Sequence, residues 1–336
     1  MSRQRRIPTP SWERDRGISG SFSGSRGQII AVAGAVLLVV VALGAIGYGF
    51  LQNYLDDLHR PDSTALSVGD YSYTVRDFTN RSKMYVKQIG GTTNYQIILP
   101  SVTSQLEEQA VLLKYASEKN VSVTDDEVKT QIATQLGITS TDPNFGQRLQ
   151  EDETSTGLSD SQYRDMARAA ALHTKMTTEF TNELPSSIDS VDYRQIVVAD
   201  QTTADNIKSQ IEAGGDFSAL AAANSTDTNT KDKGGEVGWT PKGYLSSSLD
   251  SLLFSLQVNQ VVTYPGSSSV TIYQVTAKDA SHPIDDTKKA TLASNAYQTW
   301  LQDKLSSLTV TNEMDLQTGN ADKLKYLFDH AGLTSQ

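Results

Sequence analysis

The sequence predicts an α+β protein built from three parts: an N-terminal transmembrane helix, a discontinuous, mainly helical domain, and an inserted α+β module with a small, mainly antiparallel sheet. Three observations support this fold class. One uncharged apolar block lies near the start of the chain, helical periodicity dominates to about residue 183, and β-rich segments then follow until helical periodicity returns near residue 285. A length of 336 residues also exceeds what one small core usually holds.

The apolar block, Ile29 to Leu51, is predicted to span a membrane. Its 23 residues carry no charge, and at about 1.5 Å per residue they cross a hydrocarbon layer of roughly 30 Å. The alternatives are a buried core helix, a cleaved signal peptide and a chance apolar run. A core helix rarely stays uncharged for this length, and "GYGFLQNYLDDL" offers no convincing A-x-A-like cleavage site, so an uncleaved signal anchor is favoured.

The charge distribution predicts the orientation of the chain. Residues 1–28 hold six arginines against Glu13 and Asp15, a net charge of +4, so this basic tail is expected in the cytoplasm and residues from about 52 onward outside. Subtracting this +4 from the total of −10 leaves −14 on the rest, which argues against a nucleic-acid partner for the exterior part. The sequence has no cysteine and no H-E-x-x-H motif, so no metal or other cofactor is expected.

The first exterior domain is expected over residues 62–185. Pro61 breaks the helix that continues from the membrane span, and "TALSVGDYSYT" has the pattern of a hairpin that turns at Gly69-Asp70. Thr74 is a suitable cap for a helix that begins at Val75.

Three further helices complete this domain before Pro185 marks its end. "PSVTSQLEEQAVLLKYASEKN" has an apolar stripe at helical spacing, with Asn120 as its stop. Thr124 and Glu127 have the spacing of a capping box, and another helix is capped by Ser159 or Asp160.

The α+β module is expected over residues 190–280. "VDYRQIVV" has the β-branched composition of a strand, a helix follows from Ala204 to Glu212, and a shorter one runs from Phe217 to Ala223. "EVGW", "SSSLDSLLFSL" and "VVTYPGSSSVTIYQVTA" then predict a strand, a short helix and two more strands. The order is βααβαββ, typical of one compact α+β domain.

The last helical region, residues 285–312, carries an apolar stripe that a single helix cannot bury by itself. We therefore expect it to pack back on the first helical region, which makes that domain discontinuous. Residues 313–336 are predicted to be a polar tail, with one terminal helix at "NADKLKYLFDHAG".

Residues 193–279 resemble a parvulin-type (PpiC, rotamase) peptidyl-prolyl cis-trans isomerase domain. The fragments "YRQIVV", "AGGDFSALAAANSTD", "GGEVGW", "PKGYL" and "LFSL" occur in the family's order. Residues 65–312 as a whole are similar to membrane-anchored extracytoplasmic foldases of the SurA, PpiD and PrsA type, which combine a SurA-N-like helical chaperone domain with parvulin modules. This resemblance implies unfolded or proline-containing exported polypeptides as clients.

The resemblance also implies a site, carried over position by position. Asp227 takes the family's acid or thiol position near the substrate carbonyl, and Ser268 or Ser269 takes that of the last-loop serine. Two family histidine positions hold Gln195 and Thr271 instead. The proline pocket implied by the resemblance consists of Leu245, Leu249 and Phe254.

These residues also have ordinary structural interpretations. Asp227 could cap a turn, and the three apolar residues could belong to the core. Gln195 and Thr271 could form a neutral hydrogen-bonded pair where the family has histidines. Two main functions therefore remain: an isomerase that speeds proline-limited folding, or a catalytically weak or inactive parvulin-fold holdase that binds unfolded clients. A third is a structural membrane protein whose exterior part binds a fixed partner.

Overall fold

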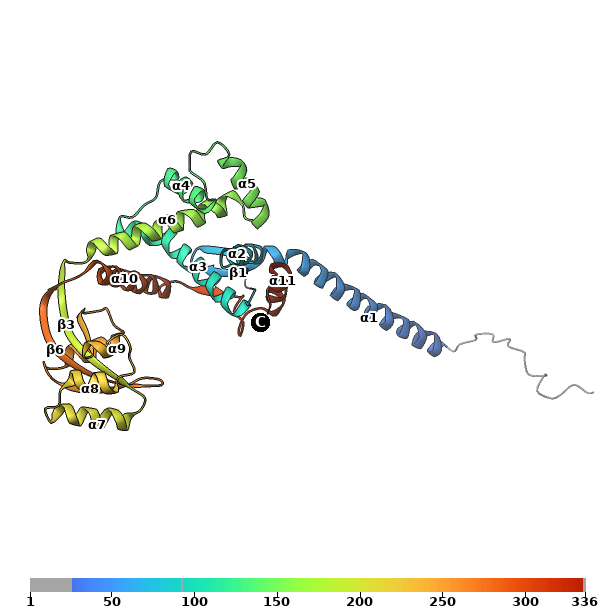
Figure 1. Ribbon diagram of the computed structural model, residues 1–336. Coiled ribbons are helices and arrows are strands. Elements are labelled where there is room, and N and C mark those ends of the chain that lie inside the picture. Colours follow the sequence, from blue (N-terminus) through green and yellow to red (C-terminus); the bar gives the residue numbers. More distant parts are fainter. Residues whose placement is uncertain (1–25, 92, 335–336) are drawn as a thin grey trace, which may run out of the picture. The chain divides into compact units, whose positions relative to one another are not determined.

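The computed structural model describes residues 26–91 and 93–334 (Figure 1). All but the last three residues of the predicted basic tail, 1–28, lie outside this part. The chain divides after Pro61 into two units. Helix α1 (Arg26–His59) belongs to the first and is continuous over the predicted membrane segment 29–51. In the described part, Leu37–Asp62 is the one stretch long and apolar enough to cross a membrane, by length and composition alone.

The second unit begins with a small sheet and a set of helices whose starts follow from their caps. Thr74 and Asp77 form a capping box at α2, Thr124 and Glu127 form one at α4, and Ser159 caps α6, as the sequence predicts. The short η2 (Arg60–Asp62) lies at the division between the units, and the elements that follow it are β1 (Thr64–Val68), β2 (Tyr71–Thr74), α2 (Val75–Gln88), α3 (Tyr95–Tyr115), η3 (Ala116–Lys119), α4 (Asp125–Gln135), α5 (Phe145–Thr156) and α6 (Asp160–Glu183).

Helix α3 begins five residues before the predicted segment and runs through Pro100. Its first turn is capped by Asn94, whose side chain accepts a hydrogen bond from the backbone N of Gln96 at 2.9 Å. The backbone N of Tyr95 donates to the carbonyl of Thr334 at 3.2 Å. A contact this distant in the sequence cannot be inferred from local periodicity.

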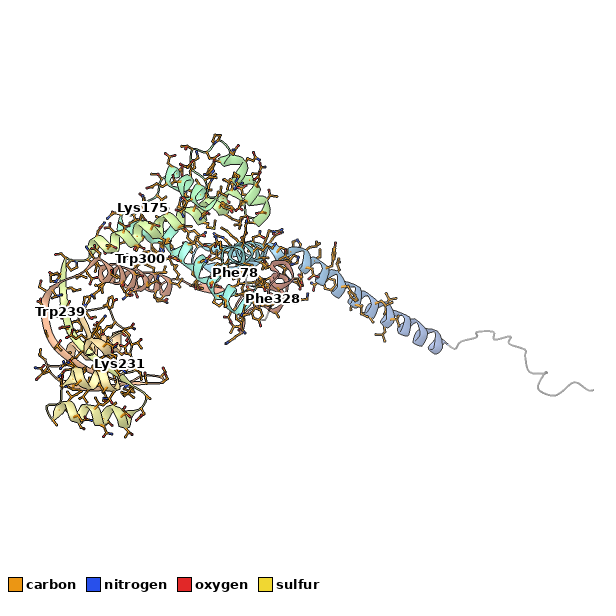
Figure 2. All side chains as sticks on the ribbon, in the orientation of Figure 1. Phe78, Lys175, Lys231, Trp239, Trp300 and Phe328 are labelled. Carbon is orange, nitrogen blue, oxygen red and sulfur yellow. The ribbon has the colours of Figure 1, made fainter. Side chains whose placement is uncertain are left out.

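The chain returns to the helical domain after the inserted module, which confirms the predicted discontinuous architecture. Helix α10 (Asp286–Ser306) packs on α3 and α6, and its Tyr297 is buried with Met176 and Phe180. Trp300, also on α10, lies beside this cluster (Figure 2). Strand β7 (Val310–Asn312) then pairs with β1 to give the sheet order β2-β1-β7.

Residues 313–334 differ from the predicted polar tail. Helix α11 (Ala321–Ala331) lies against α2, where Leu327 is fully buried in the same cluster as Phe78, and Phe328 packs beside them (Figure 2). Met314 and Leu333 are also buried there. The segment therefore completes a core, because its few apolar residues gather on one side of an amphipathic helix; residues 335–336 lie outside the described part.

The inserted module has the predicted βααβαββ order. Its four antiparallel strands are arranged β4-β3-β6-β5. In Figure 1, β3 and β6 are long strands that lead back to α6 and α10, and their far ends pair at Ser187 and Pro283. The elements are β3 (Ser187–Val198), α7 (Gln201–Glu212), α8 (Phe217–Asn224), η4 (Lys231–Lys233), β4 (Glu236–Pro241), α9 (Ser247–Ser255), β5 (Val261–Pro265) and β6 (Val270–Pro283).

Successive side chains of each strand point to opposite faces of the sheet, and both faces of this sheet are buried. Ile196 and Ile272 pack with α7 and α8 on one face. Tyr193, Tyr273 and Val275 pack with α9 on the other face. The candidate site lies on the α9 face of the sheet.

Candidate functional site

The candidate site begins with a hydrogen bond between β3 and the loop after α8. The side-chain Nε2 of Gln195 donates to Oδ2 of Asp227 at 2.8 Å. Gln195 lies opposite Tyr273 of β6, and directly paired residues point to the same face of a sheet, so the bond lies on the α9 face. Two of the four polar residues that the resemblance implies are thus brought together.

The loop holds Asp227 as an ionised carboxylate. Thr230 Oγ1 donates to Asp227 Oδ2 at 2.6 Å, and the backbone N of Asn229 donates to Oδ1 at 3.0 Å. The hydrogen bond from Thr230 lowers the pKa of Asp227; partial burial opposes this effect, and the bond from Gln195 adds to it. Asp227 therefore does cap a turn, as the structural interpretation expected, and it also presents a negative charge beside Gln195.

Gly235 allows the loop to lie directly against β3. Its φ of +83° is in the left-handed region, and a Cβ placed on it would lie 2.5 Å from the carbonyl oxygen of Gln195. The backbone N of Gln195 donates to the carbonyl of Gly235 at 2.8 Å, and the N of Gly235 donates to the carbonyl of Thr230 at 2.9 Å. A side chain at residue 235 would push the loop away from the strand.

The suggested hydrogen bond between Gln195 and Thr271 is replaced by the bond that the Gln195 side chain donates to Asp227. Thr271 lies opposite Val197 and is therefore the diagonal neighbour of Gln195. Diagonal neighbours lie about 7–8 Å apart in a sheet, farther than directly paired residues.

The three predicted pocket residues all lie on the α9 side. Leu245 precedes α9, whereas Leu249 and Phe254 belong to it, and all three are half-buried against the cluster of Tyr193 and Tyr273. Five residues of helix turn a side chain by about 140°, so Phe254 does not share the helix face of Leu249. Their common role as a proline pocket stays a prediction.

The last-loop serines lie in the hairpin that joins β5 to β6. The backbone N of Gly266 donates to the carbonyl of Ser269 at 2.8 Å and closes this hairpin, while Ser268 is exposed at its tip. Among the described residues, neither serine forms a hydrogen bond with Asp227 or Gln195, so their role also stays a prediction.

Sequence reasoning missed Thr230 and the tyrosines of this face. Thr230 follows Asp227 by three residues, a spacing that could have indicated a side-chain contact within one turn. Tyr273 contacts Tyr193 and Tyr264 with ring centroids 5.8 and 6.3 Å apart. Burial raises the pKa of Tyr193 to about 12, so its hydroxyl stays protonated. Strand register, which the sequence does not give, was needed to place Tyr273 beside Gln195.

The described residues contain no group of three or more histidine, aspartate or glutamate side chains that could hold a metal ion. The chemistry available at this site is therefore that of an anionic carboxylate, neutral amides and hydroxyls, and apolar side chains.

Comparisons with known proteins match this part of the chain. The family model of the PPIC-type PPIase domain matches residues 161–279. A PrsA foldase of Caldanaerobacter subterraneus subsp. tengcongensis is 28% identical over 162 residues, which is 48% of this chain and 51% of that protein. A PrsA foldase of Oceanobacillus iheyensis is 25% identical over 223 residues, covering 62% and 75% of the two chains.

Among solved structures, peptidylprolyl isomerase PrsA of Bacillus cereus has 20% sequence identity and a TM-score of 0.40, covering 77% of this chain and 95% of that one. The match to the Caldanaerobacter foldase spans about half the length of that relative. The chain thus contains a parvulin-type (PPIC-type) peptidyl-prolyl isomerase domain and is related to the PrsA foldases.

Proposed function

We propose that this protein is a membrane-anchored extracytoplasmic foldase that catalyses cis-trans isomerisation of X-Pro bonds in exported, unfolded polypeptides. The observation that carries the proposal is the Gln195–Asp227 bond at 2.8 Å, which lies within the PPIC-type domain next to half-buried apolar side chains. The similarity to PrsA foldases supports a role in assisting protein folding.

The proposed chemistry needs no covalent step. Amide resonance places negative charge on the carbonyl oxygen and gives the C–N bond a rotation barrier of about 18–20 kcal/mol. The carboxylate of Asp227, placed near that oxygen, disfavours the resonance form and so favours the twisted amide. The Gln195 amide holds the carboxylate in position, and the apolar side chains around α9 hold the proline ring.

The anchoring and orientation are part of the same proposal. Helix α1 contains a stretch long and apolar enough to span a bilayer, and the arginine-rich sequence before it favours a cytoplasmic N-terminus. The catalytic module would then lie outside the cell membrane, where it meets polypeptides after export.

A protease-coupled isomerisation assay on the full chain in detergent micelles tests this function. We expect the protein to accelerate isomerisation of a proline tetrapeptide and Asp227→Ala to lower kcat/KM by about tenfold or more, because it removes the carboxylate proposed to act on the substrate carbonyl. Asp232→Ala is the matched control, because Asp232 is an exposed acid of the same loop.

Three outcomes of this assay distinguish an isomerase that uses Asp227, an isomerase that does not use it, and a holdase. Absence of any acceleration by the wild-type protein rules out the isomerase, and suppressed aggregation of an unfolded client in that case supports the holdase. Equal rates for Asp227→Ala and the wild type would leave the isomerase but remove Asp227 from its mechanism. Equal losses in both aspartate variants would point to the charge of the loop rather than to the Gln195–Asp227 pair.

A further inference from the structure

A cavity lies in the helical domain, away from Asp227. It is a cleft of about 420 Å³ between α2, α3, α4 and α6, within the roughly 300–1,000 Å³ typical of ligand pockets. Its walls combine side-chain amides with flexible thioethers. The residues that supply them are Gln88, Gln105, Gln131, Gln135, Met84 and Met166.

Arg81 of α2 is the unusual residue of this cleft. Its Nη2 donates to Oε1 of the buried Gln109 at 2.5 Å, and it forms no ion pair with any other described residue. Burial lowers the pKa of Arg81 to about 10. Removing a cation from water is unfavourable unless an anion pairs with it, so the guanidinium has electrostatic stabilisation still to gain from an anionic ligand.

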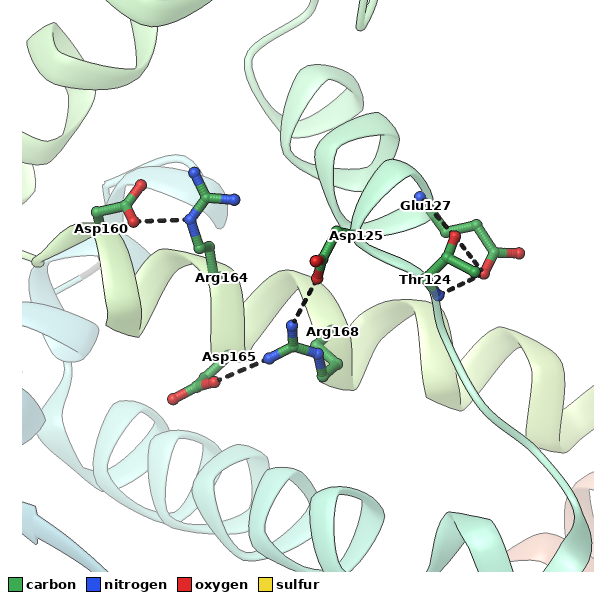
Figure 3. A network of polar contacts seen from close by, with 7 residues as sticks. All are labelled: Thr124, Asp125, Glu127, Asp160, Arg164, Asp165 and Arg168. Carbon is green, nitrogen blue, oxygen red and sulfur yellow. Dashed lines mark hydrogen bonds and ion pairs between the residues drawn. The ribbon is translucent and has the colours of Figure 1, made fainter.

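The carboxylates nearest to Arg81 on α2 and α6 already have other partners. Asp77 accepts a hydrogen bond from the backbone N of Thr74 at 2.9 Å. Asp165 accepts one from Nη1 of Arg168 at 3.4 Å, and Arg168 also pairs with Asp125 across to α4 (Figure 3). Their charges raise the pKa of Arg81 at a distance without forming an ion pair with it.

Glu108, the one carboxylate among the residues that line the cleft, is also engaged. It accepts a hydrogen bond from Nδ1 of His173 at 2.7 Å and another from the hydroxyl of Tyr297. Burial raises the pKa of Glu108, but these two hydrogen bonds outweigh the burial and lower it. Its charge is therefore stabilised within the cleft and does not pair with Arg81.

We propose that this cleft binds a peptide segment that carries a carboxylate, which pairs with the guanidinium of Arg81. A guanidinium presents parallel N–H donors that match the two oxygens of a carboxylate. Each glutamine amide offers both a donor and an acceptor, as a peptide group does, and methionine side chains adapt to different neighbours. The site goes beyond proline isomerisation, because it lies in the helical domain and requires no proline.

Fluorescence anisotropy with labelled, proline-free heptapeptides tests the proposal on the full chain in detergent micelles. Two peptides with amidated C-termini differ only in a central glutamate or glutamine. A third has the central glutamine and a free C-terminal carboxylate. We expect a carboxylate to increase the affinity at least tenfold over the amidated glutamine peptide, and comparison of the glutamate peptide with the free-terminus peptide shows whether a side chain or a chain terminus supplies it.

Variants of two arginines on α2 test whether Arg81 is responsible for the preference for a carboxylate. Arg81→Gln is expected to abolish the preference for the carboxylate, and Arg81→Lys to retain part of it, because lysine keeps the charge but not the paired donors. Arg76→Gln is the matched control: Arg76 is an exposed residue of α2 that pairs with Asp62 at 3.0 Å. Circular dichroism verifies that each variant is folded.

Equal affinity of the wild type for all three peptides would overturn the proposal, and this comparison does not depend on any variant. An equal loss of preference in Arg76→Gln and Arg81→Gln would also overturn it, because a general electrostatic effect would then suffice. Since none of the peptides contains proline, a negative result here is distinct from a failure of the isomerase proposal.

Discussion

Replacing Gly235 by alanine tests whether the candidate site depends on close contact between its loop and β3. The new Cβ would lie 2.5 Å from the carbonyl oxygen of Gln195 and 2.9 Å from a ring carbon of Phe217. Gly238 is the matched control, because its φ of +89° is similar to the +83° of Gly235 but an added Cβ there meets nothing within 4 Å. The backbone strain is thus shared, and the steric overlap belongs to Gly235 alone.

The expected loss of stability in each variant follows from the backbone strain and the steric overlap. A positive φ costs a non-glycine residue about 1–2 kcal/mol, which is the whole effect expected for Gly238→Ala. Relieving the overlap with Gln195 and Phe217 requires a shift in packed structure, which typically costs about 1–3 kcal/mol more. We therefore expect Gly235→Ala to destabilise the loop and strand by about 2–5 kcal/mol, with a central value of about 3.5 kcal/mol.

Amide hydrogen exchange of the peptide that covers β3 measures this difference locally, which matters because a chain of several cores need not unfold in one step. About 1.4 kcal/mol corresponds to a tenfold change, so the β3 amides should exchange about tenfold faster in Gly238→Ala and more than a hundredfold faster in Gly235→Ala. Equal exchange in the two variants would refute the argument that close approach, rather than φ alone, requires glycine at residue 235.

Two further predictions concern the pH dependence of the site and the last helix. Because the hydrogen-bonded Asp227 has a pKa below its usual 3.8, its carboxylate and the stability it contributes persist at higher pH and are lost only as the pH falls through that lowered pKa. The isomerisation rate should therefore be flat between about pH 5 and 8, and an inflection near 6.5, where histidine titrates, would contradict a site without histidine. Leu327→Ala should lower the free energy of unfolding of the helical domain by about 2–5 kcal/mol, because Leu327 is fully buried. Leu316→Ala, at a leucine that is 39% exposed, should cost much less, and similar thermal denaturation curves for both would show that α11 is not part of the core.

The sequence predicted much of the fold because local signals determine where most of its elements begin. Side-chain caps at Thr74 and Thr124 start their helices as expected, and the order of strands and helices in the module is correct. The early start of α3 and the burial of α11 were not predicted, because both depend on contacts with residues more than 200 positions away, such as that of Tyr95 with Thr334.

The candidate site was only partly accessible to sequence reasoning. The order of motifs, which is similar to that of the parvulin family, identified Asp227 and Gln195 as candidates. It did not show that they are hydrogen-bonded to each other, because this bond depends on how closely the loop approaches β3 at Gly235. The Gln195 side chain donates to Asp227 rather than to the suggested Thr271, and the strand register, which the sequence does not give, places Tyr273 opposite Gln195.

The inserted module is connected to the helical domain through the adjacent ends of β3 and β6. Ser187 pairs with Pro283 at the ends of β3 and β6, and the backbone N of Ile284 donates to the carbonyl of Ser186 at 3.1 Å. A chain that left out residues 187–283 would therefore have only a short gap to close between α6 and α10. Each part can thus be lost, exchanged or duplicated without rerouting the other, because the module enters and leaves the helical domain at a single point.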